Sequence, residues 1–178
     1  MKRLIISSLI IAMIIGSCAQ DKESKAQLDG FIAKENIETQ NKAIAQKIID
    51  GLNQRDTSYI ELYAPDCKYY FPSASPNPTT REDDLKATKT NLHAVPNIHW
   101  RIEEMIAEGN MVAARFTATG TQQEEWFGVP PSGNKFESGG IFIVRIENGK
   151  VVEQREDYDL LGTFMQLGME LKPVEKKK

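Results

Sequence analysis

Two β-hairpins in the second half of the chain constrain its fold most strongly. Side chains alternate between apolar and polar over residues 98–121, around a turn at Gly109-Asn110, and over residues 135–159, around a turn at Asn148-Gly149. Asn-Gly between two alternating runs is among the strongest short-range signals for a hairpin. The sequence therefore predicts a long antiparallel sheet in the C-terminal half.

Helical patterns precede this sheet. Apolar residues recur at helical spacing over residues 35–56, which predicts an amphipathic helix. Residues 57–65 predict a short second helix that Pro65 stops, and the aromatic residues that follow predict a short strand near 68–71.

A further helix is expected to begin after Thr80, which can cap it, and to end before Pro96. Asp83 and Asp84 lie in its first turn and are interpreted as capping charges, which suit the positive end of the helix dipole, and not as metal ligands. A short closing helix is expected over residues 160–168. Helices followed by an antiparallel sheet predict an α+β fold, with the helices packed on one face of a curved sheet.

The N-terminus is predicted to be a lipoprotein signal peptide, residues 1–17, because two basic residues precede a short apolar run and small residues. Residues 15–18 resemble a bacterial lipobox, which implies cleavage before Cys18 and lipid attachment there. The alternative is a plain signal peptide in which Cys18 is incidental. We expect an exported protein, lipid-anchored to a bacterial membrane on its periplasmic side or at the cell surface.

The remaining chain is predicted to comprise a tether, residues 18–33, one domain, residues 34–170, and a disordered basic tail, residues 171–178. Among the 178 residues the formal net charge is −3, so there is no electrostatic reason to expect nucleic-acid binding.

No cofactor or metal is expected either. The two histidines, His93 and His99, lack the spacing of a metal site, and no phosphate-loop or dinucleotide motif appears. Cys67 lies in an apolar stretch and is predicted to be a buried structural thiol.

Three segments together resemble the SnoaL-like polyketide cyclase family, also called ester cyclases. These are "MVAARFTATGT", "FGVPPSGNKFESGGIFIVRIENGKVVEQ" and "DYDLLGTFMQLG", in that order. The resemblance implies a cone-shaped half-barrel, in which a curved antiparallel sheet wraps over three helices around an apolar pocket. A fold of this kind hosts many activities and does not by itself give a function.

The resemblance places the acid/base residue of such cyclases at Asp159, just before the closing helix. A carboxyl in an apolar pocket can both accept and donate a proton if burial raises its pKa. The residues alone leave a second role open, because an aspartate immediately before a helix is also a favoured N-cap. Asp157 is the other catalytic candidate, and Glu156 is assigned to the opposite strand face.

Four further residues are candidates for ligand binding. The resemblance places Arg115 on the pocket wall, with Thr117 on the same strand face, although Arg115 could instead form an ion pair with Asp157 or Glu153. His99 could reach the pocket rim or be solvated. Trp126 lies in a proline-containing loop that could cover the pocket, contact a second copy, or pack on the outer face of the sheet.

These observations predict an exported domain that binds a small apolar molecule in its cone pocket. One alternative is a cofactor-independent cyclase or isomerase that uses an aspartate as acid/base. The absence of histidine from residues 139–146, where many cyclase relatives carry one, favours binding. The other alternative is a non-catalytic, dimeric structural lipoprotein. A homodimer is the partner state that the sequence leaves open.

Overall fold

The computed structural model describes the backbone of residues 2–173 and the side chains of residues 21–173. The chain divides into two compact units, residues 1–37 and 38–178. Helix α1 (Lys2–Gln54) supplies the described part of the first unit and enters the second. The described side chains of residues 21–36 are all exposed.

Several predictions concern residues outside the described part. The side chain of Cys18 and the tail residues 174–178 are not described, so the signal peptide, lipidation and tail remain predictions, as do the proposed domain boundaries. Among the helices of the described residues, none is both long and apolar enough to cross a membrane.

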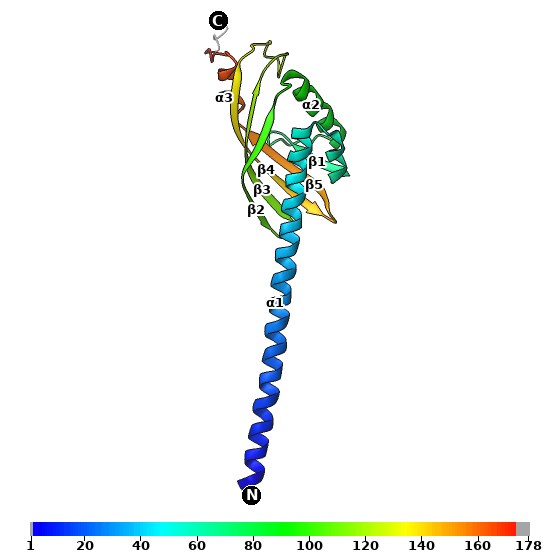
Figure 1. Cartoon of the computed structure of the whole chain (residues 1–178), viewed down its shortest axis with the longest axis vertical. Coiled ribbons are helices and arrows are strands. Elements are labelled where there is room, and N and C mark those ends of the chain that lie inside the picture. The colour runs from blue at the N-terminus through cyan, green and yellow to red at the C-terminus, as the bar shows by residue number, and fades with distance from the viewer. Residues whose placement is uncertain (1, 174–178) are drawn as a thin grey trace. The chain divides into compact units, whose positions relative to one another are not determined.

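The second unit is built on a five-stranded sheet with the order β1-β5-β4-β3-β2 (Figure 1). The predicted hairpins are confirmed. β2 (His99–Glu108) pairs antiparallel with β3 (Met111–Thr121), and β4 (Lys135–Glu147) pairs antiparallel with β5 (Lys150–Tyr158). Asn148 and Gly149 have φ values of 50° and 75°, the left-handed conformation that a tight hairpin turn requires.

The first strand corrects two local predictions. Residues 57–62 form a 3₁₀ helix (η1, Thr57–Leu62), and β1 (Tyr63–Tyr70) then runs through Pro65 instead of starting near residue 68. A register shift between Tyr63 and Lys68 leaves Pro65 outside the ladder, so its missing N–H breaks no pairing.

β1 also pairs parallel with β5, so the sheet is antiparallel only from β5 to β2. Two strands far apart in sequence carry no local sign of their relative direction.

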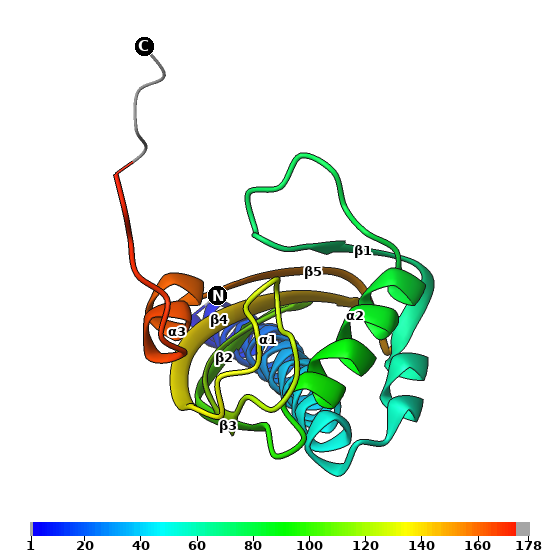
Figure 2. The ribbon, with the colours of Figure 1, turned by 90° about the horizontal axis from the view of Figure 1, so that it is seen from above.

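The fold class is confirmed as α+β with a curved, unclosed sheet. Seen from above, the strands curve around the end of α1, and α2 (Arg81–Ala94) lies on the open side (Figure 2). Side chains of β3 alternate as predicted, with Val112, Ala114 and Phe116 buried on the concave face. The closing helix α3 (Leu160–Gln166) packs against β4.

Close packing at the sheet centre requires glycine at one position. A Cβ on Gly140 would lie 2.5 Å from the Phe116 ring, 2.7 Å from Cβ of Tyr158 and 2.9 Å from the carbonyl oxygen of Asp157. A Cβ on the neighbouring Gly139 would have only one atom nearby, at 4.0 Å. The two glycines therefore meet different packing demands.

Candidate functional site

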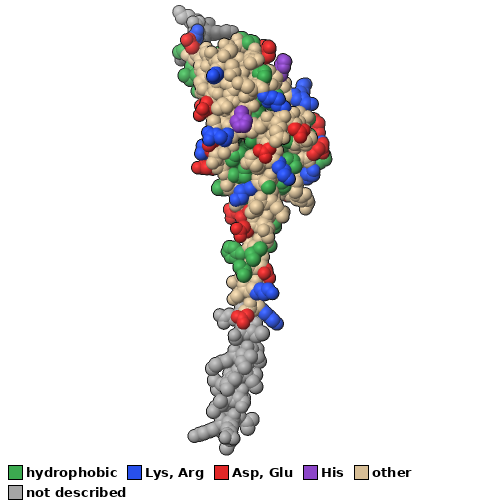
Figure 3. Space-filling model, in the orientation of Figure 1, with side chains coloured by type: hydrophobic (Ala, Val, Ile, Leu, Met, Phe, Trp, Pro, Cys, Tyr) green, Lys and Arg blue, Asp and Glu red, His purple; other side chains and the backbone are tan. Residues whose placement is uncertain are grey.

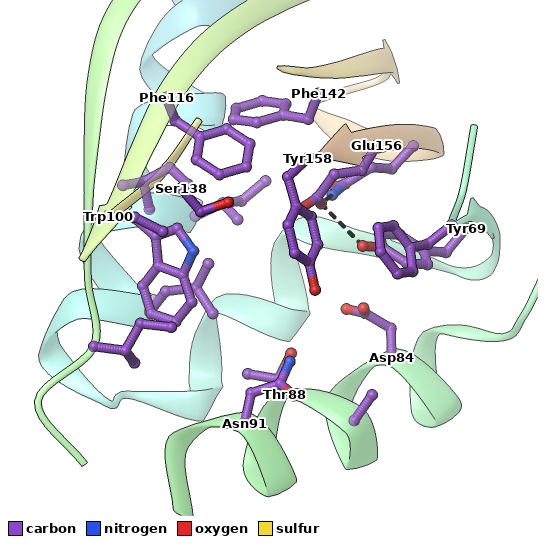
Figure 4. A pocket seen from close by; sticks show the side chains of 18 of the residues that line it. Tyr69, Asp84, Thr88, Asn91, Trp100, Phe116, Ser138, Phe142, Glu156 and Tyr158 are labelled. Carbon is purple, nitrogen blue, oxygen red and sulfur yellow. Dashed lines mark hydrogen bonds between the residues drawn. The ribbon is translucent and has the colours of Figure 1, made fainter. Parts of the chain in front are cut away.

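The concave face of the sheet, the end of α1, and α2 enclose a pocket of about 160 Å³ (Figure 4). Its walls are mostly apolar and rich in aromatic rings, with Ile48, Phe116 and Phe142 among them. An engineered cavity of about 150 Å³ is large enough to bind benzene. On the same scale this pocket can hold a molecule of one or two small rings.

Asp84 lies on α2, with its carboxyl pointing into the pocket toward Tyr69 and Tyr158 (Figure 4). Within the described residues, the carboxyl accepts no hydrogen bond. Burial, with a smaller effect from the charge of Glu156, raises the pKa of Asp84 to about 7. The group can therefore gain and lose a proton near neutral pH.

The interpretation of Asp84 as a capping charge is wrong, whereas that of Asp83 is confirmed. Thr80 and Asp83 form a reciprocal capping box, in which the Thr80 hydroxyl oxygen accepts from the Asp83 amide and the Asp83 carboxylate accepts from the Thr80 amide. One residue further along the helix turns the Asp84 side chain by about 100° toward the sheet.

Glu156 is the second carboxyl of the pocket and projects from β5. Its Oε2 accepts hydrogen bonds from the Tyr69 hydroxyl at 2.9 Å and from Gln154 Nε2 at 3.0 Å. The Tyr63 hydroxyl donates to Gln154 Oε1 at 2.6 Å, which fixes the amide orientation. Burial raises the pKa of Glu156, and the two hydrogen bonds only partly oppose this effect.

The strand alternation explains why Glu156 faces inward. The pocket is lined by every second residue of the last part of β5, namely Gln154, Glu156 and Tyr158. Arg155 and Asp157 lie on the other face. A register shift between β4 and β5 near Arg145 separates this part of the strand from Val151, which is also buried. Beyond this shift, Glu156 and Asp157 lie on opposite faces of the strand, as predicted. The pocket, however, is on the face of Glu156 and not on that of Asp157.

Aromatic groups with fixed hydrogen bonds complete the wall. Trp126 is buried, and its Nε1 donates to Asn91 Oδ1 of α2 at 2.9 Å. The Tyr59 hydroxyl donates to Thr88 at 3.3 Å, and burial raises the pKa of Tyr59 to about 12. Tyr158 stacks on Phe71 with ring centroids 4.9 Å apart. Because these hydroxyls remain protonated at neutral pH, they act as neutral hydrogen-bonding groups.

Of the predicted site residues, Trp126 alone lines the pocket. Asp159 caps α3, where its carboxylate accepts from the Gly162 amide at 2.8 Å. Asp157 accepts from the amide and hydroxyl of Ser73 and so anchors the loop after β1. Asp159 and Asp157 are therefore exposed residues with structural roles, whereas Asp84 and Glu156 are the carboxyls that line the pocket.

The other predicted ligand-binding residues lie outside the pocket wall. Arg115 is half-exposed and forms an ion pair with Glu104 at 3.3 Å, not with Asp157 or Glu153. The Thr117 hydroxyl donates to Glu103 at 2.6 Å. His99 is exposed. On the face of the molecule shown in Figure 3, acidic and basic side chains are interspersed.

Sequence reasoning missed Asp84 and undervalued Glu156. Strand alternation placed Glu156 on the same face as Gln154 and Tyr158. This shared face was the feature of the sequence that could have indicated that Glu156 enters the pocket. For Asp84 the available signal was weak, because the residues three and four positions later on the same helix face, Ala87 and Thr88, are small and only one of them is apolar. Among the described residues, no group of three or more His, Cys, Asp or Glu side chains could hold a metal ion.

Comparison with known proteins identifies the family. The model of the SnoaL-like polyketide cyclase family matches residues 42–167, which include both carboxyls of the pocket. The chain belongs to this family.

Two curated relatives share part of the sequence. Aklanonic acid methyl ester cyclase DnrD of Streptomyces peucetius is 35% identical over 69 residues, which are 38% of this chain and 48% of that protein. Aklanonic acid methyl ester cyclase DauD of Streptomyces sp. strain C5 is 35% identical over 60 residues, 34% of this chain and 37% of that protein. The matches thus span less than half the length of these relatives.

Solved structures share the fold over the whole domain. AclR of Streptomyces galilaeus superposes with a TM-score of 0.68 at 27% identity, covering 74% of this chain and 97% of that chain. IdmH of Streptomyces antibioticus gives a TM-score of 0.65 at 26% identity, covering 72% and 99%. The cone fold expected from the sequence is therefore confirmed.

Proposed function

We propose that this domain binds a small, mostly apolar carbonyl compound in its cone pocket and catalyses cyclase- or isomerase-type proton transfer on it. Asp84 is the acid/base in this proposal. The observation that carries it is the Asp84 carboxyl itself, which enters an aromatic pocket without a hydrogen bond from the described residues and has a pKa near neutrality. A base with such a pKa is well matched to proton abstraction at neutral pH.

The chemistry requires one base and one set of oxygen-stabilising donors. Removal of a proton from the carbon next to a carbonyl leaves an enolate, whose oxygen needs a hydrogen-bond donor. The Tyr158 hydroxyl faces the pocket near Asp84 and donates no hydrogen bond within the described part of the chain (Figure 4). Tyr158 can therefore donate to the developing oxyanion while Asp84 holds the proton.

Family membership and the names of the two relatives support a cyclase-type reaction over binding alone. The aspartate that the resemblance favoured, Asp159, is engaged as a helix cap, and the pocket supplies a different carboxyl for the same task. The two carboxyls of the pocket come from different elements, since Asp84 lies on α2 and Glu156 on β5.

The test is exchange of the α-protons of a small aryl 1,3-diketone into deuterated water, followed by proton NMR with the full-length chain. We expect saturable exchange that falls about 10²- to 10⁴-fold in Asp84→Asn, the contribution typical of a general base. Asp83→Asn is the matched control, since it changes the adjacent exposed carboxylate, and it should retain the rate. Equal rates in Asp84→Asn and the unaltered chain would refute the proposed role.

We also propose that Cys18 carries the lipid anchor and that the domain is exported. The layout of residues 1–18 supports both. Metabolic labelling with an alkyne fatty acid should label the chain and fail to label Cys18→Ser. Labelling that survives in Cys18→Ser would place the lipid elsewhere. A homodimer is a further proposal, and sedimentation of the purified chain would decide it.

A further inference from the structure

The pocket wall combines two acidic groups with no basic one. Asp84 and Glu156 both line it, and no Lys, Arg or His is present among its described lining residues. Arg81, on the same helix as Asp84, is not among these lining residues, and its guanidinium donates to the Glu82 carboxylate and to the carbonyl oxygen of Tyr63. The pocket therefore has two acidic groups that no basic side chain of its described wall can neutralise when they ionise.

The surroundings of the two carboxyls confirm this imbalance. Neutral groups alone, Tyr69 and Gln154, donate to Glu156, and the charges that act on either carboxyl within the described chain are other carboxylates. The other titratable groups that line the pocket are the tyrosines of η1, β1 and β5, which are neutral near pH 7. Unpaired buried charges are costly, so a positive charge brought by a ligand would be favoured here.

Aromatic rings surround the same end of the pocket. Tyr69 donates to Glu156, the Asp84 carboxyl points toward Tyr69 and Tyr158, and Phe71 stacks on Tyr158 (Figure 4). The faces of such rings attract cations, most strongly where water is excluded. Carboxylates and aromatic faces converge on one region, which is the chemistry that recognises an organic ammonium ion.

We propose that the pocket selects ligands that carry a protonated amine on a small apolar body, with the ammonium group placed between Asp84, Glu156 and the rings of Tyr69 and Tyr158. This inference rests on the proposed function, because it names the charge class of the molecule that the same pocket accepts. A ligand carboxylate is excluded, since it would face two acidic groups without a counter-ion.

The experiment uses three probes of nearly equal shape, with the full-length chain at about pH 8, above the pKa of about 7 of Asp84. These are 3-phenylpropylamine, 3-phenylpropan-1-ol and 3-phenylpropanoate, which share the phenyl ring and three-carbon chain and carry a positive, a neutral and a negative terminal group. Binding is followed by quenching of Trp100 and Trp126, which both line the pocket. We expect the amine to bind about tenfold more tightly than the alcohol and the carboxylate to bind more weakly than both.

The variant Asp84→Asn keeps the shape and removes one charge. It should bring amine binding close to that of the alcohol, and Asp83→Asn should leave the difference between the two probes as it is in the unaltered chain. Alcohol binding as tight as amine binding overturns the charge selection but leaves the pocket of the proposed function intact. Failure of all three probes to bind also overturns the charge selection, whereas the diketone exchange assay decides the proposed function separately.

Discussion

The two acidic groups of the pocket should make the domain less stable as the pH rises. An unfolded Asp84 ionises near its ordinary pKa of 3.8, whereas the folded carboxyl ionises at about 7. The folded state therefore holds a proton that the unfolded state has lost throughout this window. Stability is unaffected below the unfolded pKa, falls as the pH rises toward 7, and is constant above it.

The size of the effect follows from the displacement of the pKa. Raising it from 3.8 to about 7 corresponds to a loss of up to about 4 kcal/mol of unfolding free energy. Glu156 acts in the same direction, because burial raises its pKa too. Domains of this size are stable by about 5–15 kcal/mol, so the loss is large.

Asp84→Asn isolates the contribution of this carboxyl. Urea unfolding at about pH 5 and pH 8 should show the unaltered chain losing stability between the two, and Asp84→Asn losing much less. At pH 8 the variant should be the more stable protein, by up to about 4 kcal/mol. Asp83→Asn should retain the full decline. An Asp84→Asn chain that declines as steeply as the unaltered one would refute the burial of this charge.

Three further changes test the packing and capping assignments. Gly140→Ala should destabilise the domain by about 1–3 kcal/mol through overpacking, measured by urea unfolding, whereas Gly139→Ala should not; equal losses would contradict the close approach. Asp159→Ala should cost about 1 kcal/mol in the same assay, and Asp159→Asn should keep both the helix cap and the exchange activity, because asparagine caps as well as aspartate. Loss of activity in Asp159→Asn would return the acid/base role to that residue. Asp157→Asn should speed hydrogen exchange at the Ser73 amide, followed by NMR, since that amide donates to the Asp157 carboxylate, and an unchanged exchange rate would contradict the loop anchor.

The strands and their faces could be predicted because their signals are local. Alternation from Met111 to Thr121 fixes which side chains enter the core, and Asn148-Gly149 fixes one hairpin turn. The parallel pairing of β1 with β5 could not be predicted in this way, because it joins segments separated by most of the domain. Long-range pairing depends on how the whole sheet curves.

The candidate site was predictable only in part. The resemblance placed the acid/base residue near the end of β5, where Glu156 is found. It assigned that role to Asp159, however, and the role of Asp159 as the N-cap of α3 is enough to account for an aspartate at this position. Asp84 was hidden because its neighbour Asp83 satisfies the same capping pattern. A difference of one residue along a helix changes the face that a side chain occupies, and composition alone does not reveal which face meets the sheet.

The most direct test of the account is the pKa of Asp84 in the folded chain. The carboxyl carbon shift of Asp84 would be followed by NMR from about pH 4 to pH 9, with Asp84→Asn as the assignment control. We expect a midpoint of about 7, because the carboxyl is buried and faces a second one. A midpoint near about 4 would show a solvated carboxylate and would contradict Asp84 as the acid/base of the pocket.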